Sequence, residues 1–182
     1  MKNLKLLVIT FVTMLVLNGC YPEEEKKLQE VSWAPYIGTY VGDNSAVAGV
    51  AKDVLDVGDS IQSFDLRGQV MGIHYLTDLE MRANEEDQLK EAFLYNAMMS
   101  GILVPNAKGY KFTTDNTSIA IDRELLLTEM STLFKALPKG DDCFNNEIVS
   151  GFLKKNEPEI RKLAQDKVYK IRFYEKFQLQ QS

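Results

Sequence analysis

An apolar run close to the N-terminus sets how much of this chain can fold as a globular domain. Residues 6–19 read LLVITFVTMLVLNG, after Lys2 and Lys5 and ahead of the first acidic residue, Glu23. A short positive segment followed by such a run is typical of a secretory signal. The run is also shorter than the roughly 20 apolar residues that a membrane-spanning helix needs. An uncleaved membrane anchor is the alternative, and either reading predicts that the rest of the chain lies outside the cytoplasm.

The apolar run ends in Leu17-Asn18-Gly19-Cys20 rather than in a small-x-small peptidase site. This ending resembles the lipobox of bacterial lipoproteins. The resemblance implies that Cys20 becomes the first residue of the mature chain and carries the lipid, palmitate included. We therefore predict a lipoprotein signal peptide, lipidation at Cys20, and attachment through that lipid to the extracytoplasmic face of the bacterial cell membrane.

Lipidation of Cys20 would leave Cys143 as the sole remaining cysteine, so no intramolecular disulfide is expected. Cys143 follows Asp141 and Asp142, and neighbouring negative charge raises the pKa of a thiol rather than activating it. We interpret Cys143 as a loop or half-buried thiol and not as a nucleophile, because no base lies nearby in the sequence.

Charge is distributed unevenly along the chain. The 182 residues carry a formal net charge of −5, and two of the 21 Lys and Arg residues precede Cys20, which leaves −7 for the mature chain. Residues 152–182 hold eight basic and four acidic side chains, so the acidic excess lies in residues 20–151. An acidic body would repel phosphates, and we expect no nucleic-acid partner. The basic tail is interpreted as a solvated face, with contact to anionic lipid or to an acidic partner left open.

Four segments are predicted. They are a signal peptide (1–19), the lipidated Cys20 with a polar tether (20–32), a domain of unknown function (33–140), and a C-terminal helix and strand extension packed on that domain (141–182). Trp33 and Tyr36 stand where the tether meets the domain. Large aromatic side chains usually cover the edge of a core, although a position at the lipid interface is the alternative.

The segment GDNS (42–45) precedes apolar residues at helical spacing. Asp43, Asn44 or Ser45 can accept hydrogen bonds from the free amides of a helix, so we interpret the segment as a helix start. It lacks the glycines and lysine of a phosphate-binding loop and the alternating oxygen ligands of a calcium loop.

Further along the chain, segments in which apolar residues recur every second residue alternate with segments in which they recur at the helical spacing of about 3.6 residues. We expect two short strands that turn at Arg67-Gly68, a helix over 84–104, a hairpin formed by 110–113 and 118–121, and a helix that follows Asp122 and ends at Pro138 and Gly140. One or two short helices broken near Pro158 and a final strand over 167–180 complete the list. These elements predict an α+β fold: a single small domain with a largely antiparallel sheet packed with several helices, after the N-terminal signal peptide.

The segments TYVGDNSAV, the DL and GI strand pair, EAFLYNAMMSGIL and YKFTTDNTSIAIDRELL resemble DUF4825, a small domain of unknown function. The resemblance spans residues 37–133, and the GIHY strand departs from the pattern by carrying His74. It implies an extracytoplasmic domain of secreted or membrane-anchored proteins of Gram-positive bacteria, in some architectures attached to membrane regulatory proteins. It brings no catalytic or ligand-binding residues.

Few residues suggest chemistry. His74 is the sole histidine, and we interpret it as a partly buried structural side chain because it cannot form a multi-histidine metal site. The acidic clusters match no known metal cage, so no catalytic residue, metal or cofactor is predicted. A pair of carboxylates for glycoside hydrolysis would have to converge in the fold, which the sequence does not reveal.

The expected function is therefore that of a membrane-anchored lipoprotein, a non-enzymatic accessory or sensory binding domain with a membrane or envelope protein as its partner. A cell-envelope hydrolase that uses a carboxylate pair is the alternative, and a simple spacer is a third possibility.

Overall fold

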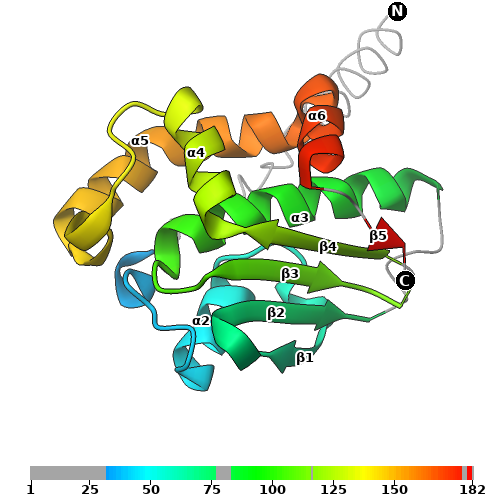
Figure 1. Ribbon diagram of the computed structural model, residues 1–182, viewed down its shortest axis with the longest axis horizontal. Coiled ribbons are helices and arrows are strands. Elements are labelled where there is room, and N and C mark those ends of the chain that lie inside the picture. Colours follow the sequence, from blue (N-terminus) through cyan, green and yellow to red (C-terminus); the bar gives the residue numbers. More distant parts are fainter. Residues whose placement is uncertain (1–31, 77–82, 116, 178–179, 182) are drawn as a thin grey trace, which may run out of the picture. The chain divides into compact units, whose positions relative to one another are not determined.

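A twisted sheet with helices packed against one of its faces forms the body of the molecule (Figure 1). The computed structural model describes residues 32–76, 83–115, 117–177 and 180–181. The strands are β1 (Ile61–Asp65), β2 (Val70–Tyr75), β3 (Gly109–Thr113), β4 (Thr117–Asp122) and the short β5 (Gln180–Gln181). The helices are α2 (Asn44–Asp53), α3 (Ala83–Leu103), α4 (Arg123–Leu133), α5 (Asn146–Gln165) and α6 (Lys167–Phe177). Short 3₁₀ turns precede α2 (Ala34–Tyr36), β1 (Gly58–Ser60), β2 (Arg67–Gln69) and α5 (Gly140–Phe144).

The strands lie in the sheet in chain order, β1-β2-β3-β4-β5. Three of the pairings are antiparallel, whereas β2 and β3 are parallel because α3 carries the chain from one end of the sheet back to the other. The predicted α+β fold with a largely antiparallel sheet is confirmed.

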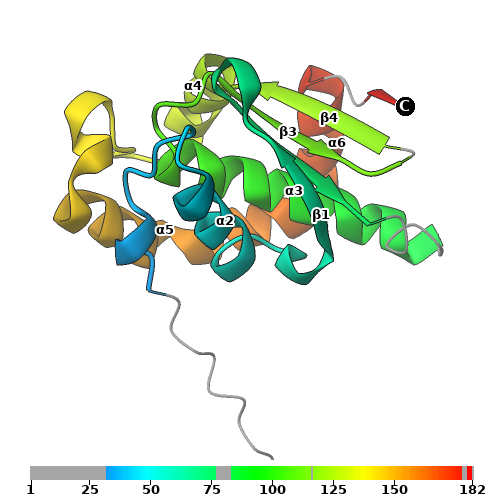
Figure 2. The same cartoon turned by 90° about the horizontal axis from the view of Figure 1, so that it is seen from below.

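One face of the sheet is buried under the helices and the other faces solvent. Ile73 in β2, Phe112 in β3 and Ile119 in β4 lie in register and are buried. Lys111 and Ala120, one position along, are exposed. This alternation is what an antiparallel sheet with one solvated face requires. Figure 2 shows α3 and α5 on the same side of the sheet.

Aromatic side chains of α3 form the centre of the core. The ring centroid of Phe93 lies 5.4 Å from that of Tyr75 in β2 and 5.6 Å from that of Phe112 in β3. All three side chains are buried, and tilted ring pairs at these distances stabilise a core beyond the area they remove from water. Helix α3 is therefore held against the two parallel strands that it connects.

The helix start predicted at GDNS is confirmed. The Asp43 carboxylate accepts hydrogen bonds from the backbone N–H groups of Ser45 and Ala46, at 3.1 and 3.0 Å. Asp122 accepts in the same way from the N–H of Leu125, at 2.9 Å, at the start of α4. Local capping chemistry thus sets where both helices begin.

The turn between β1 and β2 also lies where the sequence predicts it. Gly68 has a φ of 66°, a left-handed conformation that glycine adopts without steric cost. A second glycine, Gly49 in α2, allows a close approach, because a Cβ atom there would lie 2.8 Å from Cε1 of Tyr36. Tyr36 donates to Asp53. Tyr36 and Trp33 pack against the core cluster, as expected of aromatic residues at its edge.

The C-terminal segment differs from its prediction. Residues 167–177 form α6 and not a strand; among the described residues, only 180 and 181 there pair with the sheet. The alternation of Tyr169, Ile171 and Phe173 is misleading, because Ile171 is half exposed. The side chains that α6 buries are Tyr169, Lys170, Phe173, Tyr174 and Phe177, and their spacing is helical.

Two helix boundaries also differ. Residues 146–165 form one helix with Pro158 inside it, so the predicted break is wrong. Pro158 is exposed, and the carbonyl that loses its partner can be hydrated there. Helix α4 ends at Leu133 rather than near Pro138, because Phe134 turns to an extended conformation and is buried in the core.

Candidate functional site

Cys20 lies outside the residues that the structure describes, so its lipidation stays a prediction. In the described part of the chain, no helix is both long and apolar enough to cross a membrane.

Cys143 is 4% exposed and lies in the 3₁₀ turn before α5. Burial raises the pKa of its thiol; the nearby Arg123 opposes this effect and Asp142 adds to it. The direction agrees with the sequence-based interpretation, but burial is the main cause rather than the neighbouring acids, and the thiol is buried rather than half-buried. A raised pKa disfavours the reactive thiolate.

His74 lies near the end of β2 and contacts the neighbouring strand. Its Nδ1 is 2.9 Å from Oγ1 of Thr113, and its Nε2 is 3.3 Å from Oδ1 of Asp115. The Thr113 hydroxyl in turn donates to the Ile73 carbonyl, at 3.3 Å. The imidazole therefore links β2 to the end of β3. A nucleophilic triad would need the hydroxyl proton to point at the histidine. The Thr113 hydroxyl points at the Ile73 carbonyl, so these contacts fit a structural role at the strand ends better than a catalytic one.

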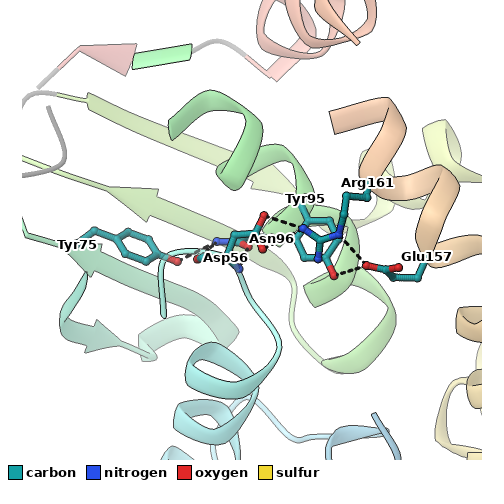
Figure 3. Close-up of polar contacts among 6 residues, drawn as sticks. All are labelled: Asp56, Tyr75, Tyr95, Asn96, Glu157 and Arg161. Carbon is teal, nitrogen blue, oxygen red and sulfur yellow. Dashed lines mark hydrogen bonds and ion pairs between the residues drawn. The ribbon is translucent and has the colours of Figure 1, made fainter. Parts of the chain in front are cut away.

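A larger polar network joins α5 to the sheet and to α3 (Figure 3). Arg161 in α5 lies at its centre. Its Nη1 is 3.2 Å from Oδ1 of Asp56, and its Nε donates to Oε1 of Glu157 at 3.0 Å. Its guanidinium carbon is 4.0 Å from the centroid of the Tyr95 ring in α3. One arginine thus makes two ion pairs and a cation–π contact.

Tyr95 completes the first half of this network. Its hydroxyl donates to the same Glu157 oxygen, at 2.9 Å. Burial raises the pKa of Tyr95 well above its ordinary value, so the phenol keeps the proton that it donates.

Asn96, which is fully buried, forms the second half. Its side-chain oxygen accepts from the backbone N–H of Asp56 at 2.7 Å, and its amide nitrogen donates to the Asp56 carbonyl at 3.0 Å. The same nitrogen is 3.1 Å from the hydroxyl of Tyr75. The next residue, Val57, has a left-handed φ of 57°, which a β-branched side chain rarely adopts. Asn96 therefore fixes the loop just before a strained residue.

The network brings two carboxylates together, those of Asp56 and Glu157, which is the arrangement that a hydrolase would require. The Arg161 guanidinium bonds to both of them. A glycosidase keeps the space between its two carboxyl groups open for the sugar and for water. Arg161 occupies the space between these two carboxylates, so their arrangement is structural. The hydrolase alternative stays a prediction, and these residues do not support it.

A pocket of about 570 Å³ lies between α3 and α6. It is lined by Asp87, Lys90, Lys167, Lys170, Ile171, Tyr174 and Glu175. Helix α6 is held beside α3 by the Tyr174 hydroxyl, which donates to the Lys90 carbonyl at 2.7 Å. Lys170 is 4% exposed, and its ammonium lies 2.8 Å from Oδ2 of Asp87. A buried ammonium beside a cavity is the most unusual charged group in the described part of the chain.

Comparison with known proteins identifies the family of this chain. Residues 34–124 match a family described as a domain of unknown function (DUF4825). The chain belongs to this family. No curated protein and no solved structure matches the chain.

The DUF4825 match contains α2, α3 and strands β1 to β4, whereas α5 and α6 lie beyond it. Both polar features join these two parts. Asp56, Tyr95 and Asn96 belong to the DUF4825 segment, and Glu157 and Arg161 to the extension. The pocket likewise takes one wall from α3 and the other from α6.

Sequence reasoning identified neither feature. Arg161 and Asp56 are 105 positions apart, and Lys170 and Asp87 are 83 apart. The sequence did offer one signal, the excess of basic residues after position 152, which includes both Arg161 and Lys170. Its interpretation as a solvated face fails for Lys170, because α6 turns that side chain inward.

No group of three or more His, Cys, Asp or Glu side chains within the described ranges is placed to hold a metal ion.

Proposed function

We propose that this chain is a lipoprotein anchored through Cys20 to the extracytoplasmic face of the cell membrane, and that its folded part is a non-enzymatic accessory or sensory binding domain. The lipobox at residues 17–20 and the polar tether behind it support the anchor. The tether of about 12 residues can reach at most roughly 40 Å, so the domain would work close to the membrane.

The pocket between α3 and α6 is the observation that carries the binding role. It forms only where the DUF4825 segment meets the extension, and its charged lining includes a buried ammonium. Pockets with a few convergent polar groups are where proteins usually bind ligands. A site shared by two parts of a chain also suits a sensor, because occupancy would favour the docked arrangement of the two parts.

The experiment is crosslinking in intact cells, followed by affinity purification of the tagged protein and mass spectrometry. A Cys20→Ala form is the matched control, since it keeps the folded domain and removes the lipid. We expect the wild-type mature chain to carry the mass of the lipid, and a membrane or envelope protein to be recovered with it and not with the control.

Two results would contradict the proposal. An unmodified Cys20 in the purified chain would contradict the proposed lipid anchor. Recovery of the same abundant envelope proteins with both forms would contradict the proposed specific partner.

A further inference from the structure

We propose that the pocket between α3 and α6 binds a phosphoryl group, with the ammonium groups of Lys90, Lys167 and Lys170 as its donors. This inference rests on the proposed binding function and names the chemistry of the ligand. Nothing in the family match assigns a ligand to this place.

The burial of the Lys170 ammonium is the first observation that favours an anionic ligand. Its side chain is almost completely buried, yet its partner Asp87 has a side chain that is 69% exposed. A carboxylate that water already solvates compensates a buried charge poorly. A methionine or leucine would fill this position in a helix at less cost, so the ammonium points to a role beyond packing.

Unused hydrogen-bond donors give the second reason. An ammonium has three N–H groups. Lys170 directs its nitrogen to Oδ2 of Asp87 at 2.8 Å and to the Asp87 carbonyl at 3.4 Å. Among the described residues, the Lys90 ammonium pairs with Glu86, at 2.6 Å, and the Lys167 ammonium has no ion-pair partner. Several positively charged donors therefore remain at one cavity, and a phosphoryl group offers several acceptor oxygens to them.

The carboxylates in the pocket limit where this group can lie. Asp87 is held by Lys170, while Glu175 lies two helical turns after Lys167 along α6. Repulsion from Glu175 would keep an anion at the end of the pocket where Lys167 and Lys170 begin the helix. The ligand would thus lie between the first turn of α6 and Lys90.

Apolar surface borders the pocket. Ile171 is 50% exposed in its lining, and Val168, 67% exposed, stands on the same helix. The phosphoryl group can belong to a soluble phosphate or to a phospholipid headgroup whose chains would contact these side chains. Both sources share the chemistry proposed here, and the experiment separates them.

The test uses the full chain with Cys20→Ala, purified in a neutral detergent, and measures the acetylation rate of each lysine by mass spectrometry. The probes are inorganic phosphate, glycerol phosphate, and vesicles of phosphatidylglycerol or of phosphatidylcholine. Lys162 is the internal control, because its side chain is 77% exposed on α5. At a probe concentration about tenfold above Kd, Lys167 should react about tenfold more slowly, with Lys162 unchanged.

Two variants test the geometry. Lys170→Met should abolish the protection of Lys167. Lys90→Gln, a substitution at a partly exposed position, should raise the probe concentration needed for half protection by about tenfold. Circular dichroism of each variant checks that the fold is retained.

Protection by the soluble phosphates supports a free ligand, and protection by phosphatidylglycerol vesicles alone supports a headgroup. Equal protection of Lys162 and Lys167, protection that survives both substitutions, or no protection by any probe would overturn the proposal. None of these outcomes touches the lipid anchor or the protein partner, because no lipidated Cys20 and no cellular partner is present in the test.

Discussion

The guanidinium carbon of Arg161 lies 4.0 Å from the centre of the Tyr95 ring, and this contact joins the C-terminal extension to the DUF4825 segment. The same arginine pairs with Asp56 and Glu157, so it contacts both parts of the chain at once. Its side chain is 43% exposed, which limits the strength of these ion pairs because water screens them.

Replacement of Arg161 should loosen this junction. We expect Arg161→Ala to lower the free energy of unfolding by about 1–2 kcal/mol, since the variant loses the cation–π contact and two partly screened ion pairs. Arg161→Lys keeps the charge but not the planar fork, and it should lose most of the same amount. Urea unfolding gives the values. Lys162→Ala on the same helix should change stability by less than about 0.5 kcal/mol, and an equal loss in both variants would contradict this account.

Asn96 should matter more than Arg161, because it is fully buried and makes three hydrogen bonds. Asn96→Ala leaves the backbone N–H and C=O of Asp56 without their partner, and we expect a loss of about 3 kcal/mol. Asn156→Ala removes a single bond to the Phe152 carbonyl at a half-buried position and should cost less than about 1 kcal/mol. Thermal and urea unfolding of both variants compare the two. A similarly small loss of unfolding free energy at both positions would show that the hydrogen bonds of Asn96 do not stabilise the loop at Asp56.

Pro158 offers a stabilising substitution. A proline inside a helix removes one backbone hydrogen bond and costs up to about 3 kcal/mol, partly offset because it restricts the unfolded chain. Pro158→Ala should therefore stabilise the protein by about 2 kcal/mol. Gly151→Ala, in open space on the same helix, should give a smaller gain of about 0.5–1 kcal/mol. If Pro158→Ala destabilised the protein while Gly151→Ala stabilised it, α5 would depend on a bend at the proline.

The acid titration of Asp65 should depend on Arg67. Hydrogen bonds from the Arg67 side chain and backbone, aided by its charge, lower the pKa of Asp65 from 3.8 to about 2. A lowered pKa stabilises the folded protein above the pKa of the unfolded chain, and that contribution disappears as the pH falls through about 2. Carbon-13 NMR of the carboxyl group should show the titration near 2 in the wild type and at a higher pH in Arg67→Ala, though still below 3.8, because the backbone N–H of residue 67 continues to donate to the carboxylate. The exposed pair should add little to stability, so an unchanged carboxyl pKa in the variant is the result that would refute this assignment.

Cys143 should react slowly with iodoacetamide while the protein is folded. Its thiol is buried and its pKa is raised, and the thiolate is the reactive form. In the Cys20→Ala background, alkylation at pH 8 should be at least about tenfold slower in buffer than in urea. Equal rates in the two solvents would mean that the turn before α5 opens readily.

Local chemistry made much of this fold predictable. Asp43 and Asp122 are caps that act on amides two or three positions away, and Gly68 determines its own turn, so these boundaries can be deduced from neighbouring residues. Among the strands, the register of Ile73 beside Phe112 could not be deduced, because the parallel pairing depends on where α3 returns the chain.

Long-range packing explains the errors. The sequence of α6 alternates over Tyr169, Ile171 and Phe173, and the helix is favoured because it buries Tyr174 and Phe177 together with Tyr169 and Phe173. The two candidate sites were hidden for the same reason. Nothing in the sequence around Asp56 and Asp87 distinguishes them from other acidic residues. Their partners, Arg161 and Lys170, lie far away in the sequence and are brought to them only by the fold.

The distance of 83 positions between Asp87 and Lys170 has a consequence for the order in which the molecule is completed. The α3 wall of the pocket is synthesised long before the α6 wall, so a chain still growing has the first and not the second. The pocket therefore forms only after α6 has been made, and any chain cut short before α6 would lack it even where strands β1 to β4 had already paired.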